Sequence, residues 1–162
     1  MKYKDLRSMP YSLREIKDLL REGNSIILPD NYYTIRNLTE IASVRTDDER
    51  LHLVEAVGYK STKDLILLGK RGYNIYSSDK FTNREETDLE KLSAACADGN
   101  AVFTYYVLDE ERKTSLSNIG EHGGKVVVCG RKRPLTGEKT PENIIGRYMC
   151  NQLIRHKHLL DV

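Results

Sequence analysis

The sequence predicts one domain of the α+β class over residues 1–162, with a mostly antiparallel sheet and about four or five helices, the last of them long. Three observations lead to this prediction. Helix-capping patterns precede several amphipathic stretches. Short β-prone runs follow one another with brief connections, which favours hairpins near 64–77 and 101–130. No internal repeat, low-complexity segment or linker divides the chain.

The first predicted helix begins after Ser12. Ser12 and Glu15 have the spacing of a capping box, in which each side chain bonds an N–H group at the start of the helix. Apolar residues within 13–20 then fall on one stripe at helical spacing. Gly23 ends the helix, because glycine accepts the left-handed conformation beyond a helix C-terminus. Residues 25–28 are predicted to form a short strand.

The stretch that follows is harder to assign. Residues 35–42 carry apolar side chains at helical spacing, which predicts a second helix. Thr46 and Glu49 form another capping-box pattern, and this pattern predicts a helix over 51–57. Residues 52–54 also suit a strand, so that alternative stays open.

A hairpin and a third helix are predicted next. Residues 65–68 and 73–77 are short β-prone runs, and the segment 69–72 between them has a glycine at each end, as a hairpin turn would. Thr87 and Glu90 have the capping-box spacing again. We therefore expect a helix from this point to the Asp-Gly-Asn sequence that precedes residue 101.

The second half of the chain predicts further strands. Residues 101–108 are rich in β-branched and aromatic side chains on both faces, which suits a central strand. A polar strand over 112–119 and a buried strand over 125–129 are expected to pair across the glycine-rich loop 120–124. Residues 131–139 form a basic loop in this prediction.

The start of the last helix has the clearest signal. Thr140 is a suitable capping residue, and Pro141 is favoured at the first helical position because its ring already has the required φ angle. Apolar residues then cover one side of the segment to about residue 160. We therefore expect a long C-terminal helix.

The three cysteines indicate a reducing compartment. Cys96, Cys129 and Cys150 are odd in number and widely spaced, so they predict no disulfide framework. We interpret them as reduced thiols in a cytoplasmic protein. No apolar run has the length of a signal peptide or of a membrane-spanning helix, so no membrane association is expected.

Charge is spread unevenly along the chain. The net charge is +2, but residues 112–162 contain ten Lys or Arg and four Asp or Glu, a net +6. Residues 79–111 contain three basic and nine acidic side chains, a net −6. A basic C-terminal third suggests an anionic partner. The alternative is that the two regions face each other or are simply solvated.

Motifs for catalysis or metal binding are absent. The glycine-rich segment 120–125 lacks the spacing and the hydroxyl residue of a phosphate-binding loop. Cysteines and histidines are not clustered as a zinc site requires, and no GxSxG sequence is present. His122, next to Glu121, is the one general base worth testing, with an ordinary loop residue as the alternative. We therefore predict no catalytic residue, no metal and no cofactor.

Basic and polar residues near the C-terminus are the candidate binding residues. Arginine and lysine bind phosphate groups, and the spacing along the last helix places several of these residues on one side. A solvated helix face is the alternative explanation. The candidates are Lys125, Arg131, Lys132, Arg133, Lys139, Arg147, Asn151 and Arg155.

Three functional classes remain open. The leading expectation is a small non-catalytic interaction protein, a regulator or inhibitor that binds a protein or an anionic partner through its surface. The second is a nucleic-acid or anionic-ligand binding protein that uses the basic C-terminal region. The third is a small enzyme whose site is assembled from residues far apart in the sequence. A macromolecular partner is expected in the first two cases.

Overall fold

The computed structural model describes residues 2–80, 84–108, 116–129 and 140–160, with the backbone alone for 156–160. Strands and helices alternate along the described chain. The elements, in order, are β1 (Tyr3–Asp5), α1 (Leu13–Arg21), β2 (Ser25–Pro29), α2 (Ile35–Val44), β3 (Leu51–Val54), α3 (Thr62–Lys70), β4 (Tyr73–Ser78), α4 (Glu86–Asp98), β5 (Phe103–Val107), α6 (Ser117–Glu121), β6 (Lys125–Val128) and α7 (Pro141–Leu160).

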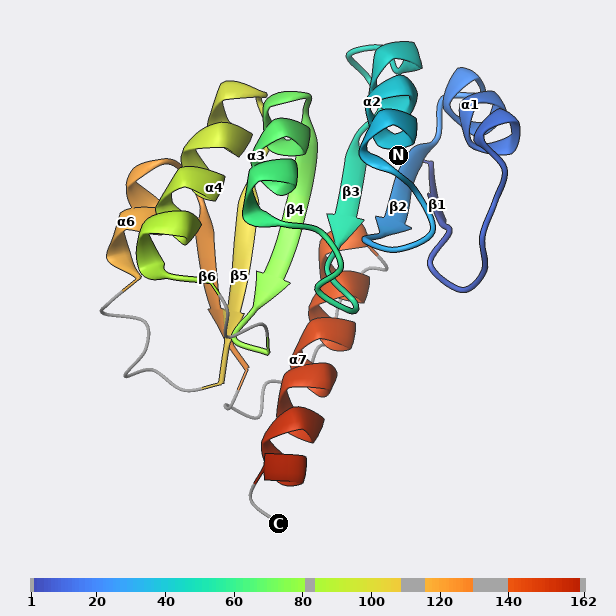
Figure 1. Ribbon diagram of the computed structural model, residues 1–162. Helices are drawn as coiled ribbons and strands as arrows, with labels where there is room; N and C mark the ends of the chain where they lie inside the picture. Colours follow the sequence, from blue (N-terminus) through green and yellow to red (C-terminus); the bar gives the residue numbers. More distant parts are fainter. Residues whose placement is uncertain (1, 81–83, 109–115, 130–139, 161–162) are drawn as a thin grey trace.

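The sheet is parallel throughout. Its six strands lie in the order β1-β2-β3-β4-β5-β6, and every neighbouring pair runs in the same direction (Figure 1). The predicted α+β class with a mostly antiparallel sheet is therefore wrong, and the fold is α/β. Parallel neighbours need a crossover connection, and here a helix lies between each strand and the next.

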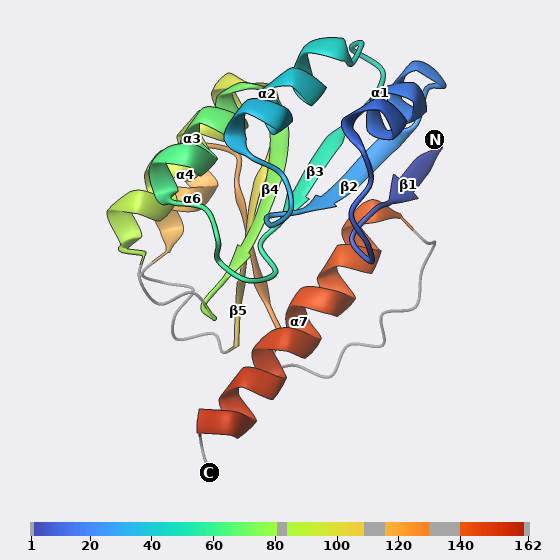
Figure 2. The same cartoon turned by 45° about the vertical axis from the view of Figure 1, so that its right-hand side comes forward.

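The order of the strands explains where the helices lie. Consecutive parallel strands joined by crossovers of one handedness place every connecting helix on the same side of the sheet. Helices α1, α2, α3, α4 and α6 accordingly cover one face, whereas α7 crosses the opposite face and extends beyond the ends of the strands (Figure 2). The sheet is thus the middle of three layers.

Two apolar cores fill the spaces between these layers. The core on the side of the five connecting helices contains Ile16, Leu38, Leu65 and Leu89, none of which is exposed. Fully burying one such side chain stabilises a fold by about 1.5–3 kcal/mol. The second core, between the sheet and α7, contains Ile27, Val54, Tyr76, Tyr106, Cys129, Ile145, Met149 and Leu153.

The first predicted hairpin is a helix followed by a strand. Residues 65–68 belong to α3, and only 73–77 lie in a strand, β4. The glycine that appeared to make a hairpin turn ends the helix instead. Gly72 has a φ of +101°, and the preceding N–H of Arg71 bonds the carbonyl groups of Leu67 and Leu68.

Other predicted elements are partly confirmed. The helix at 13–20 with its Ser12–Glu15 capping box, the strand at 25–28 and the helix at 35–42 are all present. The helix predicted over 51–57 is wrong, and the strand alternative is right, because 51–54 form β3. Glu49 does bond the N–H of Thr46, at 2.8 Å, but within a turn.

Among the elements after β4, some predictions are also confirmed and others are wrong. Helix α4 begins at Glu86, so the predicted Thr87–Glu90 cap is displaced. Strand β5 and the long helix α7 are confirmed. The strand predicted over 112–119 is wrong where the chain is described, since α6 begins at Ser117, and the second hairpin is absent because β5 and β6 are parallel. Residues 131–139 lie outside the described residues.

Two cysteines form a disulfide. Cys129, just after β6, is bonded to Cys150 in α7, and their Cα atoms are 5.1 Å apart. The prediction of reduced thiols is therefore wrong for this pair, and it is confirmed for Cys96, which is free and buried. The bond ties α7 to the last strand. Within the described part of the chain, no helix has both the length and the apolar character needed to cross a membrane.

Candidate interaction surface

Four charged side chains are buried where strands β2 to β4 end. In parallel sheets this carboxyl edge is where α/β proteins usually bind ligands. Asp30 and Glu55 come directly after β2 and β3, Lys60 precedes α3, and Arg84 precedes α4. Each of them is at most 6% exposed. Buried charges are costly unless they are paired or hydrogen-bonded, so their partners define the structure of this edge.

Asp30 organises the loop between β3 and α3. Its carboxylate accepts hydrogen bonds from the backbone N–H groups of Ala56, Val57 and Tyr59, at 3.0, 3.3 and 2.9 Å. Three such bonds satisfy a carboxylate that has been removed from water. The loop after β3 is therefore held against the end of β2.

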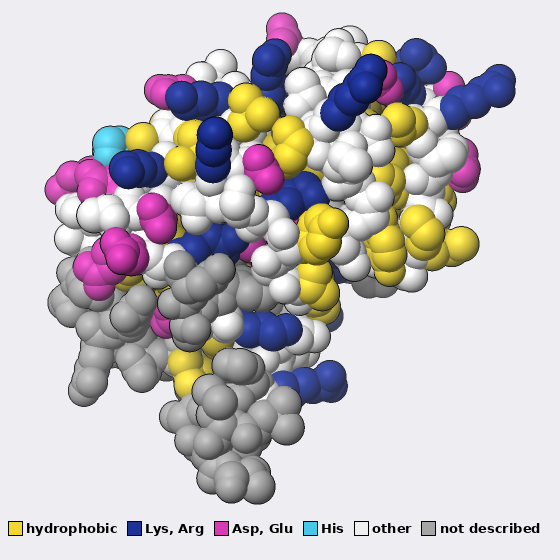
Figure 3. All heavy atoms as spheres, viewed as in Figure 1, with side chains coloured by type: hydrophobic (Ala, Val, Ile, Leu, Met, Phe, Trp, Pro, Cys, Tyr) yellow, Lys and Arg dark blue, Asp and Glu magenta, His cyan; other side chains and the backbone are white. Residues whose placement is uncertain are grey.

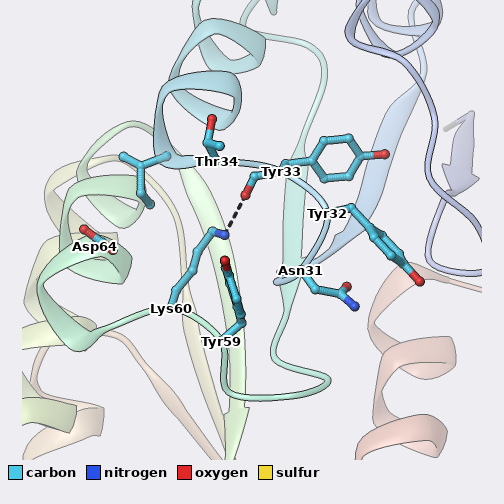
Figure 4. Close-up of a pocket in the computed structure, with 8 residues that line it drawn as sticks. Asn31, Tyr32, Tyr33, Thr34, Tyr59, Lys60 and Asp64 are labelled. Atoms are coloured by element: carbon cyan, nitrogen blue, oxygen red, sulfur yellow. Dashed lines mark hydrogen bonds between the residues drawn. The ribbon is translucent and has the colours of Figure 1, made fainter.

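Lys60, on the loop after β3, also links this loop to the loop after β2 through its side chain. Its ammonium group donates to the carbonyl oxygen of Asp30 at 2.7 Å. It also donates to the carbonyl oxygen of Tyr33 at 2.7 Å (Figure 4). Burial lowers the pKa of Lys60 below its ordinary value, although the negative charges of Asp30 and Asp64 oppose this. The lysine acts as a buried cross-link between the β2–α2 and β3–α3 loops.

Glu55 and Arg84 bring the next loop into this network. The Arg84 guanidinium forms a buried ion pair with the Glu55 carboxylate and also donates to the carbonyl oxygen of Lys60 at 3.0 Å. Burial raises the pKa of the Glu55 carboxyl above its ordinary value, although the charge of Arg84 opposes this. The loop before α4 is thereby attached to the loop before α3.

The first loop is attached through a tyrosine. The hydroxyl group of Tyr33 accepts from the N–H of Tyr11 at 2.8 Å and donates to the carbonyl oxygen of the same residue at 3.0 Å. This pair of bonds joins the β1–α1 loop to the β2–α2 loop. The loops after β1, β2, β3 and β4 therefore form one cross-linked unit, which reduces the conformational entropy that a binding event would cost.

This unit exposes large apolar side chains. Met9, Tyr32, Val57 and Tyr59 lie on the first three loops and are 56%, 55%, 57% and 73% exposed. We call these four residues the carboxyl-edge surface. Hydrophobic side chains gather at this end of the molecule, below α1 and α2 (Figure 3). Exposed apolar groups are ordinary when scattered, but a group held on neighbouring loops is typical of an interaction site.

Two cavities lie along the same loops. One, of about 520 Å³, is bordered by Tyr32, Tyr59, Lys60 and Asp64. The other, of about 440 Å³, lies between Tyr32 and α7. Tyr32 borders both, and its ring points toward α7, whereas Tyr59 stands beside Lys60 (Figure 4). The two cavities thus flank one aromatic side chain.

Tyr32 has an unusual backbone conformation. Its φ angle is +72°, in the left-handed region that bulky residues seldom adopt. Such strain costs about 1–3 kcal/mol and is concentrated at functional sites. The conformation places the tyrosine at the tip of its loop, where more than half of its surface is exposed.

The basic residues predicted from the sequence lie elsewhere. Lys125 is exposed at the start of β6, at the opposite end of the strands. Arg147, Asn151 and Arg155 are exposed on α7 at a spacing of four residues, which places them on one side of the helix. Arg131, Lys132, Arg133 and Lys139 lie outside the described residues. The binding role of this set stays a prediction.

The candidate base His122 is also remote from the carboxyl edge. It follows α6 and precedes β6, so it lies at the amino-terminal end of the sheet. Its Nε2 atom is 3.5 Å from Glu90 Oε1, and both side chains are more than one-third exposed. This arrangement is a partly solvated pair on the surface.

Sequence reasoning missed the residues of the carboxyl edge. None of the four residues Asp30, Glu55, Lys60 and Arg84 was predicted to have a role. One signal was available, because Asp30, Glu55 and Asp79 each follow within one residue of a buried strand. In a parallel sheet those positions share one edge, but the predicted antiparallel sheet would have placed them at different ends.

The fold and this edge define the class of the molecule as a parallel α/β protein with cross-linked loops at the carboxyl ends of its strands. Comparisons with protein-family models and with curated protein sequences find no match for the chain.

Proposed function

We propose that this protein is a non-catalytic interaction protein that binds a protein partner through the carboxyl-edge surface and thereby regulates or inhibits that partner. The observation that carries the proposal is the exposure of Met9, Tyr32, Val57 and Tyr59 on adjacent loops. Tyrosine and methionine are enriched at protein interfaces, where a few aromatic anchors supply most of the binding energy.

The rigidity of the loops supports the same proposal. A partner that binds flexible loops must offset the entropy of ordering them, at about 0.5–1.5 kcal/mol for each immobilised side chain. Here Asp30, Lys60 and Arg84 already fix the loops in the free protein. Their bonds are made to backbone groups of neighbouring loops, as a supporting framework requires.

An affinity experiment tests the proposal. The purified protein is immobilised and used to capture partners from an extract of its source cells, alongside the variant Val57→Ser/Tyr59→Ser. Loss of a central aromatic anchor typically costs 2 kcal/mol or more, so we expect the affinity for an identified partner to fall by roughly thirtyfold or more. Calorimetry with the purified partner gives the value.

A matched control comes from another exposed apolar residue. Leu67 lies on α3, away from the loops, and is 40% exposed. The variant Leu67→Ser should bind the partner as the wild type does. Equal binding by all three proteins, or turnover of a substrate by the wild type, would contradict the proposal.

A further inference from the structure

The three loops that carry the carboxyl-edge surface turn their charged residues inward. These loops span residues 6–12, 30–34 and 55–61, and the whole chain is 31% charged. Their charged residues are Arg7, Asp30, Glu55 and Lys60. The last three are buried, and the side chain of Arg7 is only 16% exposed. This is the reverse of an ordinary protein surface, where charged side chains are mostly exposed.

The charges beneath the surface also balance one another. They form three pairs of opposite sign, namely Arg7 with Asp5, Arg84 with Glu55, and Lys60 with Asp30. The first two are ion pairs in direct contact. In the third, the ammonium group is bonded to the backbone carbonyl of the aspartate at 2.7 Å and is attracted by its carboxylate. Because each positive charge has a negative neighbour, the loops present little net charge to a partner.

The exposed side chains of these loops are uncharged. Besides the four residues of the carboxyl-edge surface, the exposed residues are Ser8, Pro10, Ser12, Thr34 and Ser61. Charged side chains appear again in the first turns of α1, α2 and α3, namely Arg14, Glu15, Arg36, Lys63 and Asp64. Both signs occur among them. The surface therefore has an uncharged centre and a rim of mixed charge, which is typical of protein interfaces.

An uncharged surface of this kind selects against a charged partner. A charged group that is buried against it loses its hydration and finds no counter-charge, which is costly. An apolar side chain has no such cost, and the burial of its surface is favourable. The partner that these loops favour is therefore uncharged where it touches them.

Two features favour a protein over a lipid surface. Peripheral membrane proteins usually combine apolar residues with exposed basic ones that attract anionic lipids. The two basic side chains of these loops, Arg7 and Lys60, are turned inward (Figure 4). The cavities of about 520 and 440 Å³ that Tyr32 borders also leave recesses between the loops. Protruding side chains of a protein can fill such recesses, as the close packing of an interface core requires.

We propose that the partner is a protein that meets the carboxyl-edge surface with an uncharged, largely apolar patch, so that ionic contacts contribute little to the affinity. This inference rests on the proposed function and adds the chemistry of the partner. It also separates this edge from the exposed basic residues of α7, which suit an anionic partner.

Opposite charges placed at one position test this inference. The wild type, Val57→Lys and Val57→Glu are each titrated by calorimetry with the purified protein that the immobilised wild type captures. Val57 is 57% exposed, so either new charge is solvated in the free protein. We expect both variants to bind at least about tenfold more weakly, because each would bury its charge against an uncharged patch. The wild-type affinity should change by less than about threefold between roughly 50 and 500 mM NaCl.

Controls separate this inference from the proposed function. Leu67→Lys and Leu67→Glu, on α3, are matched changes and should bind as the wild type does. If one sign of charge at position 57 preserves binding and the other weakens it, or if the affinity falls steeply with salt, the partner is charged. The inference is then wrong, and the proposed function stands.

Two further outcomes would also overturn the inference. Cosedimentation of the wild type with phosphatidylcholine vesicles, lost in Val57→Ser/Tyr59→Ser, would identify a lipid surface as the occupant. If neither the charged variants of Val57 nor Val57→Ser/Tyr59→Ser changes the affinity for the captured protein, the proposed function and the inference fail together.

Discussion

Removing the positive charge of Arg84 should destabilise the protein strongly. The side chain is 3% exposed and is paired with Glu55, whose side chain is fully buried. In the variant Arg84→Met the Glu55 carboxylate would lose its counter-charge, and the carbonyl oxygen of Lys60 would lose a 3.0 Å hydrogen bond. Breaking a buried ion pair by removing one partner costs about 3–5 kcal/mol, which is a large part of the stability of an ordinary domain.

The double variant Glu55→Leu/Arg84→Met separates the charge effect from packing. With both charges replaced by apolar side chains, no buried charge is left unpaired, so most of the loss should be recovered. The hydrogen bond to the carbonyl oxygen of Lys60 is still absent in the double variant. We therefore expect its free energy of unfolding to lie within about 1–2 kcal/mol of the wild-type value.

Urea unfolding followed by circular dichroism at pH 7 and pH 5 measures these differences. In Arg84→Met the folded-state pKa of Glu55 rises further above its unfolded value of about 4.5, so the folded protein binds a proton more readily than the unfolded chain. The deficit of the single variant should therefore shrink as the pH falls from 7 to 5. A loss below about 1 kcal/mol, or a double variant as unstable as the single one, would refute the role given to this pair.

Three further predictions concern other parts of the fold. Gly99→Ala should destabilise the protein by about 1–3 kcal/mol in urea unfolding, because the added Cβ would lie 2.1 Å from the carbonyl oxygen of Gly69. The control Gly120→Ala should leave the stability unchanged, because its added Cβ meets nothing within 4 Å. Burial lowers the pKa of His52 to about 4, so the neutral form of this histidine stabilises the fold above pH 6.5. As the pH falls toward 4, the free energy of unfolding should decrease by up to about 3 kcal/mol. The variant His52→Asn should remove this pH dependence. Tyr32→Gly should raise the free energy of unfolding by about 1 kcal/mol, because glycine adopts the positive φ without strain. The same variant should weaken partner binding. A decrease in the free energy of unfolding would contradict the claim that the backbone of Tyr32 is strained.

Several helices and strands were predictable because their signals are local. Ser12 and Pro141 mark helix starts in the sequence and in the structure alike. A repeating pattern went unrecognised. The first four helices begin after the capping residues Ser12, Thr34, Ser61 and Glu85. In each case, apolar residues follow four and seven positions after the cap. That repeat, each time followed by a buried strand, is what predicts a parallel sheet.

One of the two predicted hairpins rests on an ambiguous segment. The apolar run at 65–68 is four residues long, and such a run does not distinguish a strand from a buried part of a helix. A strand at 65–68 would place Gly72 in a hairpin turn, whereas in the structure Gly72 is the left-handed residue after α3. The disulfide has no local signal in the sequence, because Cys129 and Cys150 are 21 residues apart and meet only through the placement of α7.

The carboxyl-edge network could not be read from the sequence directly. Lys60 bonds Asp30, 30 positions earlier, and Arg84 pairs with Glu55, 29 positions earlier. Nothing local distinguishes these side chains from solvated ones, because their burial follows from the strand order. The exposed aromatic residues gave no signal either, since Tyr32 and Tyr59 lie in loops of mixed composition.

The most direct test of the carboxyl-edge surface is site-specific photo-crosslinking. A photoreactive benzoylphenylalanine is placed at Val57, on the carboxyl-edge surface, or at Leu67, on α3, in the otherwise unchanged protein, and each form is irradiated with the partner identified by capture. We predict a covalent adduct from position 57 and little or none from position 67, with the modified peptide mapped by mass spectrometry. Equal adducts from both positions, or adducts from position 67 alone, would contradict the assignment of this edge as the binding surface.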